Sequence, residues 1–104
     1  MNCAASMVYR VELTHRAGRD LARLYKTINA RNSQAASDWF NSLENAILAL
    51  ESQPNRHPTM PGKACLRHIP HSSRSYIYHV IFQVDDKAQT VSVLHIRHSS
   101  QKPI

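Results

Sequence analysis

The second half of the chain concentrates imidazole and cationic side chains. Six of the seven histidines lie between residues 52 and 104, and the acids of that span are the adjacent Asp85 and Asp86. Histidine transfers protons near neutral pH, and arginine binds phosphate through paired hydrogen bonds. A region with these groups and few carboxylates is suited to phosphate chemistry without a metal ion, because magnesium sites are built from oxygen ligands.

RNA is a substrate on which such groups can act, because its 2′-hydroxyl is a built-in nucleophile. The protein must supply a base for that hydroxyl, an acid for the leaving 5′-oxygen and cations for the developing negative charge. Each candidate has an alternative interpretation as an ordinary surface residue or ion-pair partner. The candidate catalytic residues are His79, His98, Arg67 and Arg97, and the candidate phosphate-binding residues are Arg74, His95 and Lys63.

Metal and thiol chemistry have weaker support. His68 and His71 are three residues apart, as are His95 and His98. In a strand, an odd separation puts the two rings on opposite faces, so neither pair is expected to chelate a metal. Cys65 stands in an apolar run and is expected to be a buried, inert thiol. We therefore expect no metal and no cofactor.

Length and charge set further limits. At 104 residues the chain is the size of one small domain. Its formal net charge of +6 favours a polyanion or an acidic protein as partner, unless the basic balance has no specific purpose. There is no apolar run of about 18 residues, so no membrane partner is expected. The N-terminus lacks a secretory signal pattern, which favours the cytoplasm.

The hydrophobic pattern predicts one sheet and a helical hairpin. Alternating apolar and polar residues predict strands, and apolar residues every three or four positions predict amphipathic helices. Thr14 and the Asn32–Ser33 pair are suited to cap the two helices. The expected elements are a strand at 8–13, helices at 15–31 and 33–52, a proline-rich loop at 53–63, and strands at 65–70, 75–84 and 90–97.

This order predicts an α+β fold. An N-terminal strand and a helical hairpin precede a three-stranded antiparallel meander, and all strands form one sheet with the helices on one face. Residues 8–104 are expected to form a single domain. Residues 1–7 are expected to be a disordered or extended N-terminus.

Strand alternation assigns the candidate residues to faces. Val80 and Phe82 belong to the better core face, so His79 is expected on the opposite, open face. Arg67 is expected to reach that same open face from the preceding strand. In the last strand, alternation groups Val93 with His95 and Arg97, and its apolar character on both faces predicts burial on both sides.

The chain resembles the RelE/ParE toxins of bacterial type II toxin–antitoxin systems. Leu66-Arg67 before a proline and the terminal Ile96-Arg97-His98 are short signatures within a diffuse pattern. The resemblance covers nearly all of residues 8–101. Its carrying segments are YRVELTHRAGRDLARLYKTI, AASDWFNSLENAILALESQPNRHP and LRHIP…YIYHVIFQVDD…VSVLHIRHSSQ.

The resemblance implies a compact sheet with a helical hairpin and a cognate antitoxin, acidic and partly disordered, that neutralises the toxin. It also implies one of two targets. RelE-like members cleave mRNA without a metal, usually on the ribosome, which would make this chain an endoribonuclease that inhibits translation. ParE-like members inhibit DNA gyrase and are not nucleases.

By position, Arg67 matches a basic residue of the family, and His79 falls where a catalytic arginine is usual. Arg97 and His98 fall near the last basic group. Two expected lysines are missing, and no tyrosine follows Arg97. The resemblance therefore leaves both targets open.

Overall fold

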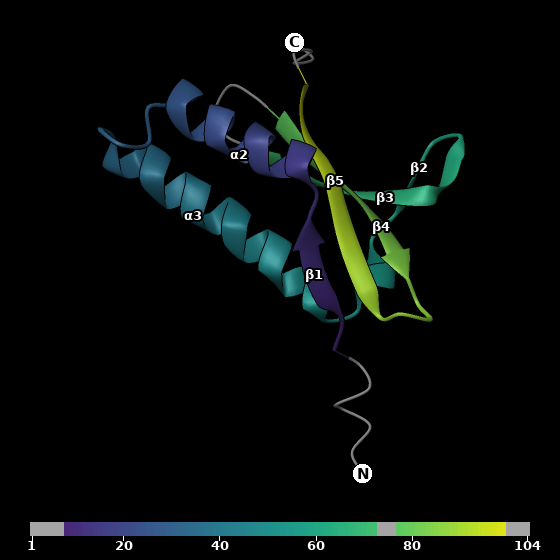
Figure 1. The fold of residues 1–104 in the computed structure, drawn as a ribbon. Coiled ribbons are helices and arrows are strands. Elements are labelled where there is room, and N and C mark those ends of the chain that lie inside the picture. Colours follow the sequence, from purple (N-terminus) through teal and green to yellow (C-terminus); the bar gives the residue numbers. More distant parts are fainter. Residues whose placement is uncertain (1–7, 73–76, 100–104) are drawn as a thin grey trace.

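The computed structural model describes residues 8–72 and 77–99. The predicted N-terminal segment 1–7 and Arg74 lie outside the described residues. The two helices lie on the same side of one sheet (Figure 1). The elements are β1 (Arg10–Leu13), α2 (His15–Thr27), α3 (Gln34–Leu48), 3₁₀ turns at Ala49–Glu51 and Pro54–Arg56, β2 (Thr59–Met60), β3 (Lys63–Ser72), β4 (Ile77–Asp85) and β5 (Thr90–Ser99).

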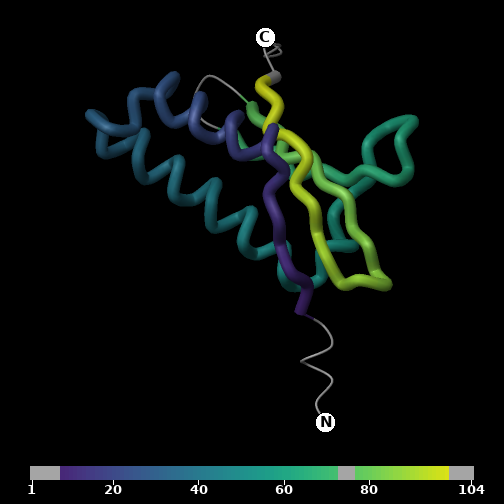
Figure 2. Tube along the Cα trace, in the orientation of Figure 1, coloured from purple at the N-terminus to yellow at the C-terminus, as the bar shows by residue number. Residues whose placement is uncertain are grey.

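The strand order across the sheet is β1-β5-β4-β3-β2. Strands β1 and β5 pair in parallel, and the other neighbouring strands pair in an antiparallel manner. The predicted α+β fold is confirmed. The sheet has one more strand than expected, because Thr59 and Met60 of the proline-rich segment pair with the start of β3. The β2–β3 hairpin projects from the rest of the sheet (Figure 2).

Both predicted helix caps are present. The Thr14 hydroxyl accepts a hydrogen bond from the Ala17 amide at 3.1 Å, and the Ser33 hydroxyl accepts one from Ala36 at 3.2 Å. These bonds satisfy amides that would otherwise lack a partner at a helix start. The Thr14 hydroxyl also donates to the carbonyl of Val93, so the same residue fixes α2 against β5.

The core lies between the helices and the sheet. Its members are buried apolar side chains from α2, α3, the 3₁₀ turn Ala49–Glu51, β4 and β5, and the predicted core face of β4 is confirmed. Val80 and Phe82 are fully buried. The cluster comprises Ala17, Leu21, Leu24, Phe40, Leu43, Ile47, Leu50, Tyr78, Val80, Phe82, Val91, Val93 and Ile96.

A β-bulge in β5 overturns the expected grouping of its residues. Phe82 pairs with Val93 and Ile81 pairs with His95, so Leu94 is an extra residue between the two pairs. An extra residue reverses the faces beyond it. Val93 therefore faces the core, whereas His95 and Arg97 belong to the other face.

No helix in the described part of the chain is long and apolar enough to cross a membrane.

Candidate functional site

The open face of the sheet brings together two histidines and an arginine. His79 pairs with Pro70 on one side and with Arg97 on the other, and His68 lies two positions from Pro70 on the same face. Diagonal neighbours on adjacent strands are within reach of long or aromatic side chains. We call His68, His79 and Arg97 the open-face cluster.

The two imidazoles of this cluster meet through equivalent atoms. The Nδ1 atoms of His68 and His79 are 3.3 Å apart, and the ring centroids are 5.4 Å apart. Partial burial lowers the pKa of His79, and the nearby His68 and Arg97 lower it further. The described salt bridges are Arg10–Glu12 and His95–Asp20, so none of them reaches the cluster. His79 therefore favours its neutral form.

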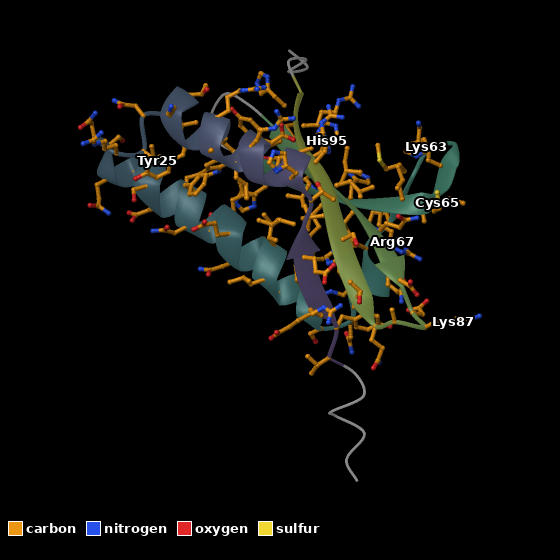
Figure 3. All side chains as sticks on the ribbon, in the orientation of Figure 1. Tyr25, Lys63, Cys65, Arg67, Lys87 and His95 are labelled. Atoms are coloured by element: carbon orange, nitrogen blue, oxygen red, sulfur yellow. The ribbon has the colours of Figure 1, made fainter. Side chains whose placement is uncertain are left out.

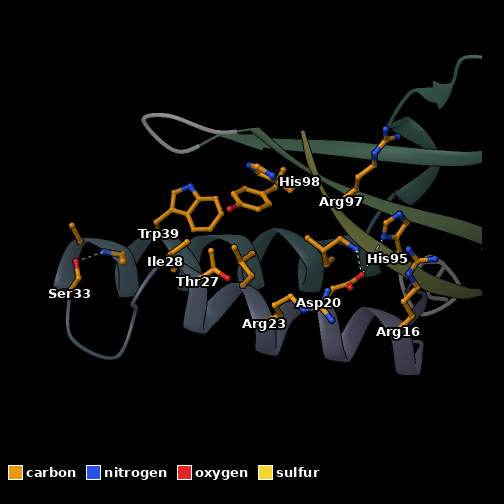
Figure 4. Close-up of a pocket in the computed structure, with 15 residues that line it drawn as sticks. Arg16, Asp20, Arg23, Thr27, Ile28, Ser33, Trp39, His95, Arg97 and His98 are labelled. Atoms are coloured by element: carbon orange, nitrogen blue, oxygen red, sulfur yellow. Dashed lines mark hydrogen bonds and ion pairs between the residues drawn. The ribbon is translucent and has the colours of Figure 1, made fainter. Parts of the chain in front are cut away.

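His98 does not join His79. It pairs with Tyr78, a core residue, and its ring lies 4.9 Å from the Tyr78 ring on the helix side of the sheet. There it lines a groove of about 1080 Å³ between the two helices and the end of β5. Trp39 lines the same groove, and the centroids of the Trp39 and Tyr78 rings are 5.4 Å apart. Figure 4 shows Arg97 directed away from α2.

His95 is held at the sheet edge by a carboxylate from the first half of the chain. Asp20 of α2 places one oxygen 3.3 Å from His95 Nδ1 and accepts a hydrogen bond from the Ile96 amide at 3.0 Å (Figure 4). Beyond the end of β1, the Asp20 carboxylate thus serves as the hydrogen-bond acceptor for the edge of β5. The histidine-rich half has few carboxylates of its own, but α2 supplies one as a partner for His95.

Arg67 lies on the face opposite to His79, so its predicted position was wrong. It pairs with the buried Phe82, and its guanidinium donates to the His57 carbonyl. Figure 3 shows Arg67 well apart from His95. Hydrogen bonds from Tyr9 and Asn55 lower the pKa of Asp86, and the positive charge of Arg67 lowers it further. Arg67 therefore binds the loop that precedes β2.

The remaining candidates are scattered. Lys63 is exposed at the start of β3, in the projecting hairpin (Figure 3). Cys65 lies in the same hairpin and is exposed, so the expectation of a buried thiol was wrong. The cause is that the apolar run reaches beyond the helices that would cover it. The described residues contain no group of three histidines, cysteines or carboxylates that could hold a metal ion.

The structure thus keeps His79 and Arg97 together and adds His68, which the sequence had suggested only as half of a metal pair. The alternation of β3 placed His68 and His71 on opposite faces, and this is confirmed. His71 contacts Ser42 of α3, with its Nε2 atom 2.9 Å from the hydroxyl. The alternation of β3 could place His68 on a face of the sheet. It could not identify His79 as its partner, because that depends on the register of β3 against β4.

The fold is that of toxins of the RelE/ParE superfamily. A family model described as "ParE toxin of type II toxin-antitoxin system, parDE" matches residues 11–103. The chain therefore belongs to this family of toxins from type II toxin–antitoxin systems. A comparison with curated proteins gave no significant match.

Solved structures show the same fold. The chromosomal ParDE system from P. aeruginosa aligns with a TM-score of 0.69 and 16% identity, over 89% of this chain and 97% of that chain. The RelBE2 toxin–antitoxin complex from Mycobacterium tuberculosis aligns with a TM-score of 0.58 and 26% identity, over 91% and 95%. The intact E. coli RelBE complex aligns at 0.62 with 18% identity, over 89% and 99%.

Proposed function

We propose that this toxin is a metal-independent endoribonuclease that cleaves mRNA and so inhibits translation in the cytoplasm. The observation that carries the proposal is the open-face cluster, in which two imidazoles and a guanidinium share the sheet face opposite the two helices (Figure 1). Two imidazoles supply the base and the acid that cleavage by the 2′-hydroxyl requires. The guanidinium of Arg97 stabilises the charge that develops on the phosphate.

The neighbourhood of the cluster supports this chemistry. The lowered pKa of His79 favours its neutral ring, which has one nitrogen that can accept a proton and one that can donate it. Arg97 is exposed, which leaves its guanidinium accessible to a phosphate in solution. His98 and His95 lie at the groove and the edge, where they are suited to contact flanking nucleotides and not the scissile phosphate.

Inhibition of DNA gyrase without nuclease activity is the second candidate. The observation that favours it is the match to the ParE family model, supported by the likeness to the ParDE system. In that case the open-face cluster would have no catalytic role, and a protein–protein surface would carry the activity. The two candidates predict opposite results for RNA and for DNA supercoiling.

A cognate antitoxin is the expected partner in either case, because the structural neighbours include toxin–antitoxin complexes. The net charge of +6 supports an acidic antitoxin, partly disordered before it binds. Arg16 and Arg23 of α2 line the groove together with Trp39, which offers both charge and apolar contact to such a chain.

The deciding experiment adds the full-length toxin to a cell-free translation reaction and, in parallel, to a gyrase supercoiling assay. We expect rapid loss of intact mRNA in the presence of EDTA-treated toxin, with supercoiling unaffected. His79→Gln should abolish the loss of mRNA, whereas the matched control His15→Gln, on the exposed start of α2, should not. Inhibited supercoiling with intact mRNA would replace the ribonuclease by the gyrase inhibitor.

A further inference from the structure

The His68–His79 contact restricts where protons can sit. Two Nδ1 atoms at 3.3 Å form a hydrogen bond only if one carries a proton and the other has a lone pair. In the neutral pair, the ring that donates through Nδ1 has a lone pair at Nε2, and the ring that accepts carries a proton at Nε2. One hydrogen bond therefore makes one Nε2 a base and the other a donor.

We propose that His68 and His79 form a proton relay in which His68 removes the proton of the RNA 2′-hydroxyl and His79 protonates the leaving 5′-oxygen. This inference rests on the proposed ribonuclease function and assigns a role within it. His68 is a catalytic residue in this scheme, although the sequence offered it only as a potential metal ligand.

The relay balances as three proton transfers around one displacement. The 2′-hydroxyl gives its proton to His68 Nε2, and its oxygen forms a bond to phosphorus. His68 passes its Nδ1 proton to His79 Nδ1, and His79 gives its Nε2 proton to the 5′-oxygen as the P–O5′ bond breaks. The products are a 2′,3′-cyclic phosphate and a 5′-hydroxyl, with the tautomers of the two rings exchanged. Exchange with water then restores the starting tautomers.

The surroundings of the pair favour these roles. His79 has the Arg97 guanidinium beside it, and its pKa is lowered by burial, His68 and Arg97. A lowered pKa makes protonated His79 a stronger acid, which suits the residue that protonates the leaving group. Within the described residues, the hydrogen bonds of both rings involve Nδ1 alone, which leaves each Nε2 available to a substrate.

Metal binding by the same two nitrogens is less consistent with the structure. Zinc bound by two histidines at about 2.0–2.1 Å would also bring their nitrogens close together. The described residues provide no third ligand to form a group of three. The neighbouring Arg97 adds positive charge, which opposes a bound cation. A shared proton requires only the two rings.

Paired substitutions test the relay. The side-chain amide of asparagine stands at the position of histidine Nδ1, and the side-chain amide of glutamine stands at the position of Nε2. His68→Asn therefore retains a partner for His79 Nδ1 but has no base, so we expect mRNA cleavage to fall by about 100-fold or more. His68→Gln and His79→Gln should lose as much. The double variant His68→Gln/His79→Gln should cleave mRNA no more slowly than the less active of its two single variants, because each substitution interrupts the same relay.

Two readouts separate the possible failures. Long-range ¹H–¹⁵N spectra of the metal-free toxin should show one ring protonated at Nδ1 and the other at Nε2. Both rings protonated at Nε2, Zn²⁺ binding through both Nδ1 atoms, or His68→Asn cleaving at nearly the wild-type rate would each overturn the relay while ribonuclease activity stands. Wild-type toxin that leaves mRNA intact would instead overturn the proposed function and the relay with it.

Discussion

The open-face cluster and the region around Arg67 both contain histidine and arginine, but the partners of these side chains differ between the two regions. On the open face, His68 and His79 contact each other, and Arg97 is exposed. On the other face, Arg67 donates to the His57 carbonyl, and Asp86 accepts hydrogen bonds from Tyr9 and Asn55. The guanidinium of Arg67 is bound to a backbone carbonyl and so stabilises the fold, whereas the exposed guanidinium of Arg97 remains available to a substrate.

The largest expected effect comes from substituting the arginine of the open-face cluster. Arg97→Gln should lower the rate of mRNA cleavage by about 10²–10³-fold, because it removes charge stabilisation at the phosphate. Its melting temperature should stay close to that of the wild type, since Arg97 is exposed. Cleavage is measured with a labelled mRNA and stability by thermal denaturation.

Arg67→Gln is the matched control for that substitution. It should lower the free energy of unfolding by about 1–3 kcal/mol, because a charged hydrogen bond to the His57 carbonyl is lost. Cleavage by the folded fraction should change by no more than a few fold. The opposite pattern, with Arg67 needed for cleavage and Arg97 for stability, would reverse our assignment of the two faces.

An intermediate effect is expected at the sheet edge. Asp20→Ala should reduce the free energy of unfolding by about 1–3 kcal/mol, because the Ile96 amide and His95 lose a carboxylate that is only 16% exposed. Urea denaturation measures the change. Asp38→Ala is the control, since Asp38 lies on the exposed side of α3 and bonds only Gln34 among described contacts. Equal losses in both variants would argue against a structural role specific to Asp20.

The smallest effect concerns the ionisation of Tyr9. Its hydrogen bond to the Asp86 carboxylate raises the pKa of Tyr9 above the ordinary 10.0 and lowers the pKa of Asp86 below 3.8. Stability from this pair is present between those values. It is lost as pH falls through the lowered pKa of Asp86 or rises through the raised pKa of Tyr9. Asp86 is exposed and Tyr9 only partly buried, so solvent and salt screen the interaction.

Substitution of Asp86 should shift the Tyr9 titration. In Asp86→Asn, the pKa of Tyr9 should fall toward 10.0, as followed by its aromatic NMR signals. Asp85→Asn is the control, because Asp85 accepts bonds from the Lys87 and Ala88 amides of the turn and not from Tyr9. A similar shift in both variants would show that general charge, and not the direct bond, sets the pKa.

Much of the fold could be predicted from the sequence, because it depends on local rules. The caps at Thr14 and Ser33, the order of elements and the core face of β4 follow from side-chain type and periodicity. The helices end earlier than expected, at Thr27 and Leu48, and β3 and β5 are longer. Apolar periodicity continues past a helix end, so it marks the buried side better than the boundary.

The candidate site could be predicted only in part. His79 was correctly expected on the open face. Arg67 was expected there but lies on the other face, and the alternation of β5 had grouped Arg97 with the buried Val93. The bulge at Leu94 is the main reason in β5, because one extra residue exchanges the two faces. Exposure of Cys65 had a different cause, since local apolar character does not say whether another element covers it.

The sequence by itself determined the class of fold, the basic charge and the supply of histidines in the second half. The tertiary structure alone decided which of these residues meet. Pairing of β3 with β4 brought His68 to His79, and the packing of α2 against β5 brought Asp20 to His95. The physical reason is that periodicity is a property of each segment, whereas register and helix docking depend on contacts between segments far apart in the chain.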